Sequence, residues 1–222
     1  MKSMNYINKL LPQLGAAFKS QDHELFDIVF DIEGKKLYAD KLILSISSPT
    51  FKSMLSDRWI SKNDAIKIET YKYDDFKELL TFIYSGECNL SNENIFTMLD
   101  VAEFYQTEDL KKLCDEYLSK LELKLTNIFQ LLETSNKYSL IQMKEKIQTF
   151  VFQKFANFTK FDGFLNADKS IVKEIVAMES NLSKHHEKMF QYVSLYFVYF
   201  LTREVREVFL EFLLENGLKL KI

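Results

Sequence analysis

Residues 26–55 read FDIVFDIEGKKLYADKLILSISSPTFKSML, and this stretch decides the fold. In its first seven residues, Phe26 and every second residue after it are large and apolar, which is the period of a half-buried β-strand. Glu33-Gly34 predicts a tight turn, because glycine accepts positive φ without a Cβ clash. Residues 36–39 then return as a second strand, so the stretch begins with a hairpin.

The second half of the same stretch predicts two short helices. From Lys41 the apolar spacing changes to that of a helix, and its apolar side chains are expected to be buried: Leu42, Ile43, Leu44 and Ile46. Ser47-Ser48 supplies hydroxyl groups for an N-cap, and Pro49 fits the first position of the next helix. The apolar face of that helix consists of Phe51, Met54 and Leu55.

The flanking sequence is mainly helical. Residues 6–20 form an amphipathic helix with an apolar stripe of Ile7, Leu10, Leu11, Leu14 and Phe18. Residues 65–69 alternate as a third strand, and residues 74–84 form a helix that ends at Gly86. Ser91 and Thr107 are each expected to cap a helix, and no strand pattern follows Leu123.

Ordered blocks of this sequence resemble the BTB/POZ family. The block in the deciding stretch matches the family signature without a gap at Asp27, Phe30, Gly34, Leu37, Ala39, Lys41, Leu44, Phe51, Met54 and Leu55. The later blocks are FIYSG at 82–86, AEFYQ at 102–106 and LCDEYL at 113–118. Residues 127–138 and 142–155 are similar to the helical pair that starts the 3-box or BACK region of ligase adaptors.

The resemblance implies an α+β fold class and three segments. Residues 1–22 would be an N-terminal dimerisation helix. Residues 23–121 would be the BTB/POZ domain, a small β-sheet flanked by a helical cluster. Residues 122–222 would form an all-α, 3-box/BACK-like domain.

Composition argues against nucleic acid or a membrane as the main partner. The formal net charge is −3 with both signs interspersed, whereas nucleic acid or anionic lipid would favour a basic face. The longest apolar run, residues 189–201, is shorter than the ~20 residues that span a bilayer, and residues 1–21 lack a signal-peptide pattern. Two cysteines, Cys88 and Cys114, are typical of reduced thiols, so we expect a cytoplasmic or nuclear protein.

No catalytic constellation is visible in the sequence. Of the three histidines, His185 and His186 are adjacent, and helical neighbours point in different directions. Nucleophile-elbow, phosphate-loop and zinc-protease motifs are absent from the sequence. Acidic pairs such as Asp74-Asp75 stand at helix starts, where the helix dipole explains them. We therefore expect a non-enzyme without catalytic residues, cofactor or metal.

The family resemblance implies a homodimer. The matching contact positions are Leu10, Leu14, Ala17 and Phe18 in the N-terminal helix, with Ile43 from the first helix after the hairpin. Each copy would offer the same patch, as in any isologous interface. Asp27 and Lys41 occupy the positions of a charged pair in the dimer groove, and a fold-stabilising ion pair is favoured there over a corepressor site.

The resemblance also implies docking on cullin-3. Trp59 is the only tryptophan and stands in a polar stretch, SDRWISKND. In cullin-binding relatives this loop carries a hydrophobic-x-Glu motif, and Trp59, Ile60 and Ser61 take its three positions. Loss of the glutamate would weaken binding roughly ten- to a hundredfold. A second contact region is implied around Tyr84, Phe104, Tyr105 and Gln106.

Two functions follow as hypotheses. In the first, a homodimeric adaptor docks on the cullin-3 N-terminal domain and brings a substrate protein to a RING ubiquitin ligase. The substrate would bind through the C-terminal helices, a heterodimer partner or another domain. In the second, the chain is a BTB self-association scaffold, or a transcription-type or dominant-negative assembly module, that does not bind cullin.

Overall fold

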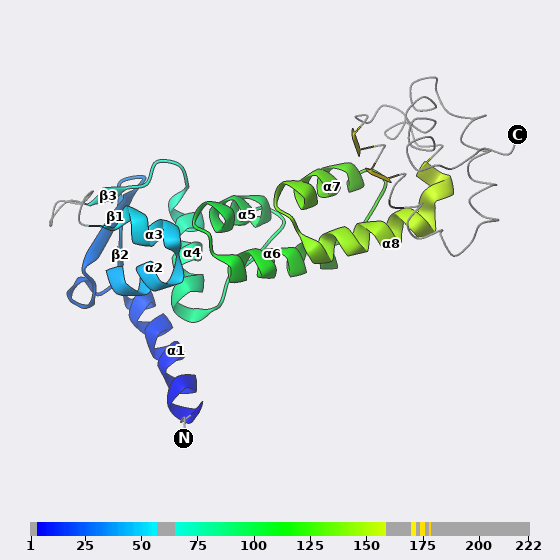
Figure 1. Cartoon of the computed structure of the whole chain (residues 1–222). Helices are drawn as coiled ribbons and strands as arrows, with labels where there is room; N and C mark the ends of the chain where they lie inside the picture. Colours follow the sequence, from blue (N-terminus) through cyan, green and yellow to red (C-terminus); the bar gives the residue numbers. More distant parts are fainter. Residues whose placement is uncertain (1–3, 57–64, 159–169, 172–173, 176–177, 179–222) are drawn as a thin grey trace, which may run out of the picture. The chain divides into compact units, whose positions relative to one another are not determined.

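The computed structural model describes residues 4–56, 65–158, 170–171, 174–175 and 178. The chain forms two compact units, of which the first ends at Tyr117 and the second begins at Leu118. Helices dominate both units, and a small sheet lies in the first (Figure 1). No helix in these described ranges is long and apolar enough to cross a membrane.

The sheet has three strands in the order β2-β1-β3. β1 (Ile28–Ile32) and β2 (Lys35–Ala39) form the predicted antiparallel hairpin, and β3 (Ile66–Lys67) runs parallel to β1. Glu33 and Gly34 form the turn with φ of 54° and 76°, the left-handed conformation that a two-residue hairpin turn requires. The buried face of the hairpin carries Phe30, Ile32, Leu37 and Ala39.

Two short helices follow the hairpin, as predicted. α2 (Lys41–Ser47) begins after Asp40, whose carboxylate accepts the Ile43 N–H at 2.9 Å. α3 (Pro49–Met54) begins after Ser48, whose hydroxyl accepts the Phe51 N–H at 3.1 Å. The same hydroxyl donates to the Tyr105 carbonyl, so this N-cap also ties α3 to the segment after α5.

α1 (Met4–Ser20) packs against α4 (Tyr73–Ser85). The two helices approach closely at Gly15, where an added Cβ would lie 3.1 Å from the Ser85 Cβ. α4 ends at Gly86, as predicted, with φ of 75° and its N–H donating to the Phe82 carbonyl at 2.7 Å. A short 3-10 helix, His23–Leu25, joins α1 to β1.

Ser91 makes the predicted capping bond, but the helix begins later than predicted, because α5 (Ile95–Phe104) starts four residues after Ser91. Asn94 Oδ1 accepts the Ser91 N–H at 2.8 Å and Ser91 Oγ accepts the Asn94 N–H at 3.3 Å, which are the reciprocal bonds of a capping box. This reciprocal pair closes a turn before the helix. α6 (Glu108–Lys120) then follows the buried Thr107.

The core of the first unit is aromatic. Phe51 and Tyr105 stack with ring centroids 4.3 Å apart, and Phe30 meets Phe76 edge-on at 5.1 Å. Such pairs add about 0.5–1.5 kcal/mol beyond the area they bury. The aromatic contacts therefore join β1, α3, α4 and the end of α5 around one centre.

The second unit contains the predicted helical pair, α7 (Ile128–Lys137) and α8 (Ile141–Phe158), which pack together. Glu174 joins them through a polar network, because it accepts from Asn136 at 2.6 Å and pairs with Lys144 at 3.0 Å. Ile171, Glu174 and Ile175 are helical, in line with the all-α region expected over residues 122–222. Residues 159–169 and 179–222 of that region lie outside the described residues.

Candidate protein interaction site

The predicted dimer contacts divide between the surface and the core. Leu10 is 39% exposed, and Leu14, Ala17 and Ile43 are half-buried. Phe18 is only 2% exposed and stacks on Tyr84, with ring centroids 4.6 Å apart. Its side chain therefore belongs to the core of its own chain and leaves almost no surface for a second copy.

Both α1 and α2 carry exposed apolar side chains. Leu42 and Ile46 lie one turn apart on α2 and are 69% and 76% exposed, while Leu44 on the opposite side is buried. The expectation that all of these residues are buried is therefore wrong, because a single helix turns only one side to the core. Leu10 and Leu11 are exposed on α1, whose N-terminal half extends beyond the other elements of this unit (Figure 1). We call Leu10, Leu11, Leu42 and Ile46 the helix patch.

Asp27 and Lys41 are joined by a hydrogen bond between the Asp27 side chain and the Lys41 main chain. The Asp27 carboxylate accepts the Lys41 N–H at 2.7 Å, and Asp40 accepts the Ile43 N–H. Both carboxylates thus satisfy free N–H groups in the first turn of α2, where the helix dipole favours negative charge. These bonds give Asp27 a structural role at the base of the helix patch and explain why an acidic residue precedes Lys41.

Tyr84 makes a hydrogen bond to Asp40, the residue between β2 and α2. Its side chain is 1% exposed, and its hydroxyl oxygen accepts the Asp40 N–H at 2.6 Å. Burial raises the pKa of the Tyr84 hydroxyl to about 12, because the phenolate loses its hydration. Tyr84 was predicted as a cullin contact, and its burial leaves it little surface for a partner.

The end of α5 presents the exposed part of the predicted cullin surface. Phe104 is 57% exposed, whereas Tyr105 is 2% exposed. The Thr50 hydroxyl donates to the Phe104 carbonyl at 2.9 Å, which anchors this turn to α3. Gln106 is exposed with φ of 52°, so the chain reverses here and turns both Phe104 and Gln106 outward. Trp59, Ile60 and Ser61 lie outside the described residues.

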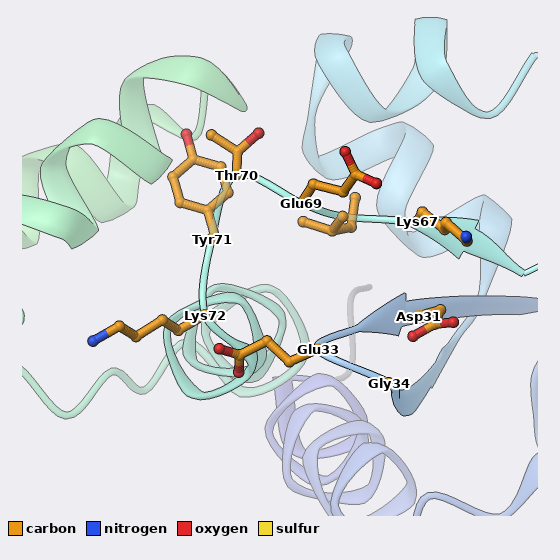
Figure 2. Close-up of a pocket in the computed structure, with 9 residues that line it drawn as sticks. Asp31, Glu33, Gly34, Lys67, Glu69, Thr70, Tyr71 and Lys72 are labelled. Atoms are coloured by element: carbon orange, nitrogen blue, oxygen red, sulfur yellow. The ribbon is translucent and has the colours of Figure 1, made fainter.

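A polar groove of about 490 Å³ lies where β3 continues past the end of the hairpin (Figure 2). Charged side chains line much of it: Asp31, Glu33, Lys67, Glu69 and Lys72. Glu33 accepts the Tyr73 N–H at 3.0 Å and so caps α4, whose N-cap residue has no side-chain bond of its own. Glu33 thus has a structural role at the start of α4, and the residues that line the groove include no histidine or cysteine.

The two cysteines are not reactive thiols. Burial raises the pKa of both Cys88 and Cys114 to about 12, so both are protonated at neutral pH. Within the described ranges, no cluster of three histidine, cysteine or acidic side chains could hold a metal ion. The exposed apolar and aromatic side chains described above, such as Leu42, Ile46 and Phe104, suit association with another protein.

Comparison with known proteins identifies the family of the first unit. Residues 17–122 match the sequence model of the BTB/POZ domain. Armadillo BTB Arabidopsis protein 1 of Arabidopsis thaliana is 29% identical over 150 residues, which are 67% of this chain and 20% of that protein. Protein maternal effect lethal 26 of Caenorhabditis elegans is 29% identical over 143 residues, 63% and 36% of the two chains. Kelch-like protein 7 of Mus musculus is 24% identical over 157 residues, 70% and 27%.

The fold and the exposed surfaces define a protein-interaction module, and residues 17–122 are a BTB/POZ domain. The chain spans between about a fifth and somewhat over a third of the length of these curated relatives. Among solved structures, the BTB domain of zebrafish PATZ1 is 18% identical, with a TM-score of 0.48 over 55% of this chain and 98% of that one.

Proposed function

We propose that this chain is a homodimeric BTB adaptor that docks on the cullin-3 N-terminal domain and brings a substrate protein to a RING ubiquitin ligase. The observation that carries the proposal is the helix patch, at the segments where the BTB resemblance implies dimer contacts. We place this activity in the cytoplasm or the nucleus, in line with the sequence expectation.

The helix patch supports pairing with a second copy. Leu42 and Ile46 each leave more than two thirds of their surface in water. Burying a leucine or isoleucine side chain contributes about 1.5–3 kcal/mol of favourable free energy. A partner that covers both Leu42 and Ile46 would therefore be bound more tightly. Because a second copy carries the same patch, a two-fold axis through α1 and α2 would bury both patches at once.

The dimer is tested with a double substitution in the patch. Leu42→Ser with Ile46→Ser makes the α2 part of the helix patch polar without touching the buried Leu44. We expect light scattering after size exclusion to give the mass of a dimer for the native chain and a monomer for the double variant. Leu25→Ser is the matched control, because Leu25 is 56% exposed and lies outside the patch. A dimer in the double variant would exclude this face.

Docking on cullin-3 is supported by the exposed end of α5 and by the identity of Trp59. Phe104 offers an aromatic ring to a partner, and large aromatic side chains dominate interface energetics. Its ring lies 6.3 Å from Tyr71 and 5.0 Å from Tyr105, so it is held at the surface by other aromatics. An anchored aromatic loses little conformational entropy when a partner covers it.

The docking test is a calorimetric titration with a cullin-3 N-terminal domain. We expect Trp59→Ala to abolish binding and Phe104→Ala to weaken it at least about tenfold. Phe96→Ala is the control, since Phe96 lies on the same helix, is 36% exposed and precedes Phe104 by two turns. Ser61→Glu restores the carboxylate of the family motif and is expected to tighten binding roughly ten- to a hundredfold.

The alternative function is a BTB scaffold that self-associates without cullin. Ser61, which stands where cullin-binding relatives carry glutamate, favours it. The same titration separates the two functions: no heat with the native chain, while light scattering still reports a dimer, supports the scaffold.

A further inference from the structure

The two edges of the small sheet differ in whether their main chain is already bonded. On the β2 edge, the Gln21 amide acts like one residue of an added strand. Its Oε1 accepts the Tyr38 N–H at 2.8 Å, and its Nε2 donates to the Tyr38 carbonyl at 3.3 Å. This edge is therefore occupied by a side chain at its centre.

On the β3 edge, by contrast, the outward-facing main-chain groups have no hydrogen-bond partner in the described part of the chain. Ile68 N–H donates to the Asp31 carbonyl at 3.0 Å, so Ile68 directs its main chain toward β1. Successive strand residues direct these groups to alternate sides, which turns the N–H and C=O of Lys67 and Glu69 away from the sheet. In the ranges that the structure describes, no hydrogen bond reaches the main chain of either residue.

The side chains of this edge also alternate. Lys67 and Glu69 are exposed, and Ile68 between them is 8% exposed. Figure 2 shows the chain running extended through Lys67 and Glu69 before it turns at Tyr71. The exposed face of the edge thus carries one positive and one negative charge, two residues apart, and neither side chain has an ion-pair partner in the described ranges.

We propose that the β3 edge is a second self-association surface, which pairs antiparallel with the β3 edge of another copy. In the register that places Ile68 opposite Ile68 of the second copy, Lys67 faces Glu69 and Glu69 faces Lys67. Both pairs are of the hydrogen-bonded kind, so the two edges exchange four main-chain hydrogen bonds.

The charges select this register. A shift that centres the pairing on Lys67 opposes two lysines, and a shift that centres it on Glu69 opposes two glutamates. Opposite charges across a strand pair stabilise it, and like charges directly opposite destabilise it. The edge is therefore complementary to itself in one register, which identifies a second copy of this chain as the partner.

This surface is separate from the helix patch. A chain with two isologous faces does not stop at a dimer, since each dimer still offers two open β3 edges. With the helix patch paired as proposed above, β3 pairing would join dimers end to end. Only four hydrogen bonds and two ion pairs form at each junction, so growth is expected only at high protein concentration.

The test measures self-association by sedimentation equilibrium in the Leu42→Ser, Ile46→Ser chain, in which the α2 part of the helix patch is polar and pairing through the patch is expected to be lost. We expect a weak, concentration-dependent dimer. Adding Lys67→Glu or Glu69→Lys opposes like charges at both pairs and is expected to weaken it about tenfold or more. An equimolar mixture of the two reversal variants restores both opposite-charge pairs and is expected to associate about as well as the parent.

Lys67→Pro supplies an independent check on the main-chain bonds. Proline is tolerated on an edge strand where its missing N–H faces solvent, and the bonds of Ile68 to β1 remain. We expect this variant to lose association more completely than Lys67→Ala, which keeps the N–H. Equal association of all charge variants, or no association of the parent chain at millimolar concentration, would overturn the proposal.

Discussion

The positions that the BTB resemblance marks as contacts fall into a core group and a surface group. Phe18, Tyr84 and Tyr105 are at most 2% exposed, whereas Leu10 and Phe104 are 39% and 57% exposed. The two groups are close in sequence, and Phe104 and Tyr105 are neighbours. The difference teaches that a family pattern identifies the segments that carry an interface, while packing within one chain decides which side chains can touch a partner.

The largest expected effect comes from Phe18 in the core group. Phe18→Ala removes a ring that stacks on Tyr84 and meets Phe26 edge-on at 6.5 Å. We expect the free energy of unfolding, measured by urea denaturation, to fall by about 3–5 kcal/mol. Leu10→Ala on the same helix is the comparison, and we expect it to cost under about 1 kcal/mol in the monomeric helix-patch variant. Equal losses would erase the distinction between the two groups.

Tyr84→Phe tests the hydroxyl within the core group. The ring and its stacking on Phe18 are kept, but the Asp40 N–H loses its acceptor in a half-buried position. Leaving such a donor without a partner costs about 1–3 kcal/mol. The measurement is again urea denaturation, and a neutral result would show that another acceptor replaces the hydroxyl.

The pH dependence of stability gives a further test of Tyr84. Burial raises the pKa of its hydroxyl from 10 to about 12 in the folded chain, so the folded state keeps the proton longer than the unfolded state. The stability that depends on this proton is fully present below pH 10 and is lost as pH rises toward 12. Tyr84→Phe has no such proton, so its unfolding midpoint should fall less steeply over this range.

Asp40→Ala should have a smaller effect than either core change. It removes the carboxylate that accepts the Ile43 N–H at the start of α2, and loss of an N-cap costs about 1 kcal/mol. Asp109→Ala is the control, because Asp109 is 82% exposed and its ion pair with Lys112 lies at the surface. A cost below that of the control would show that the Asp27 bond to the Lys41 N–H holds the helix start without Asp40.

Local rules predicted the parts of the fold that local energetics determine. The hairpin turn at Gly34, the N-cap at Ser48 and the helix stop at Gly86 each follow from the conformational preference of one or two residues. The start of α5 was placed too early because Ser91 and Asn94 make their capping bonds around a turn that precedes the helix.

Contacts between residues far apart in the chain could not be predicted from the apolar pattern of the sequence. Four apolar residues at 42–46 do not reveal which of them face α4, because a seven-residue helix shows fewer than two turns of its period. The Gln21 amide on the β2 edge joins residues seventeen apart, and Glu33 caps a helix forty residues away. Such bonds depend on how the elements are packed, so no local signal in the sequence announces them.

Phe104→Ala has the smallest expected effect on stability, and its neighbour Tyr105 provides the comparison. Tyr105→Ala removes a buried ring that stacks on Phe51, with an expected cost of about 3–5 kcal/mol. Phe104→Ala removes an exposed ring, and its carbonyl still accepts from Thr50, so we expect unfolding to change by under about 0.5 kcal/mol. Phe104→Ala should nevertheless weaken cullin-3 docking about tenfold. If the stability loss in Phe104→Ala approached that of Tyr105→Ala, its ring would be part of the core, and its exposure could no longer be assigned to a partner.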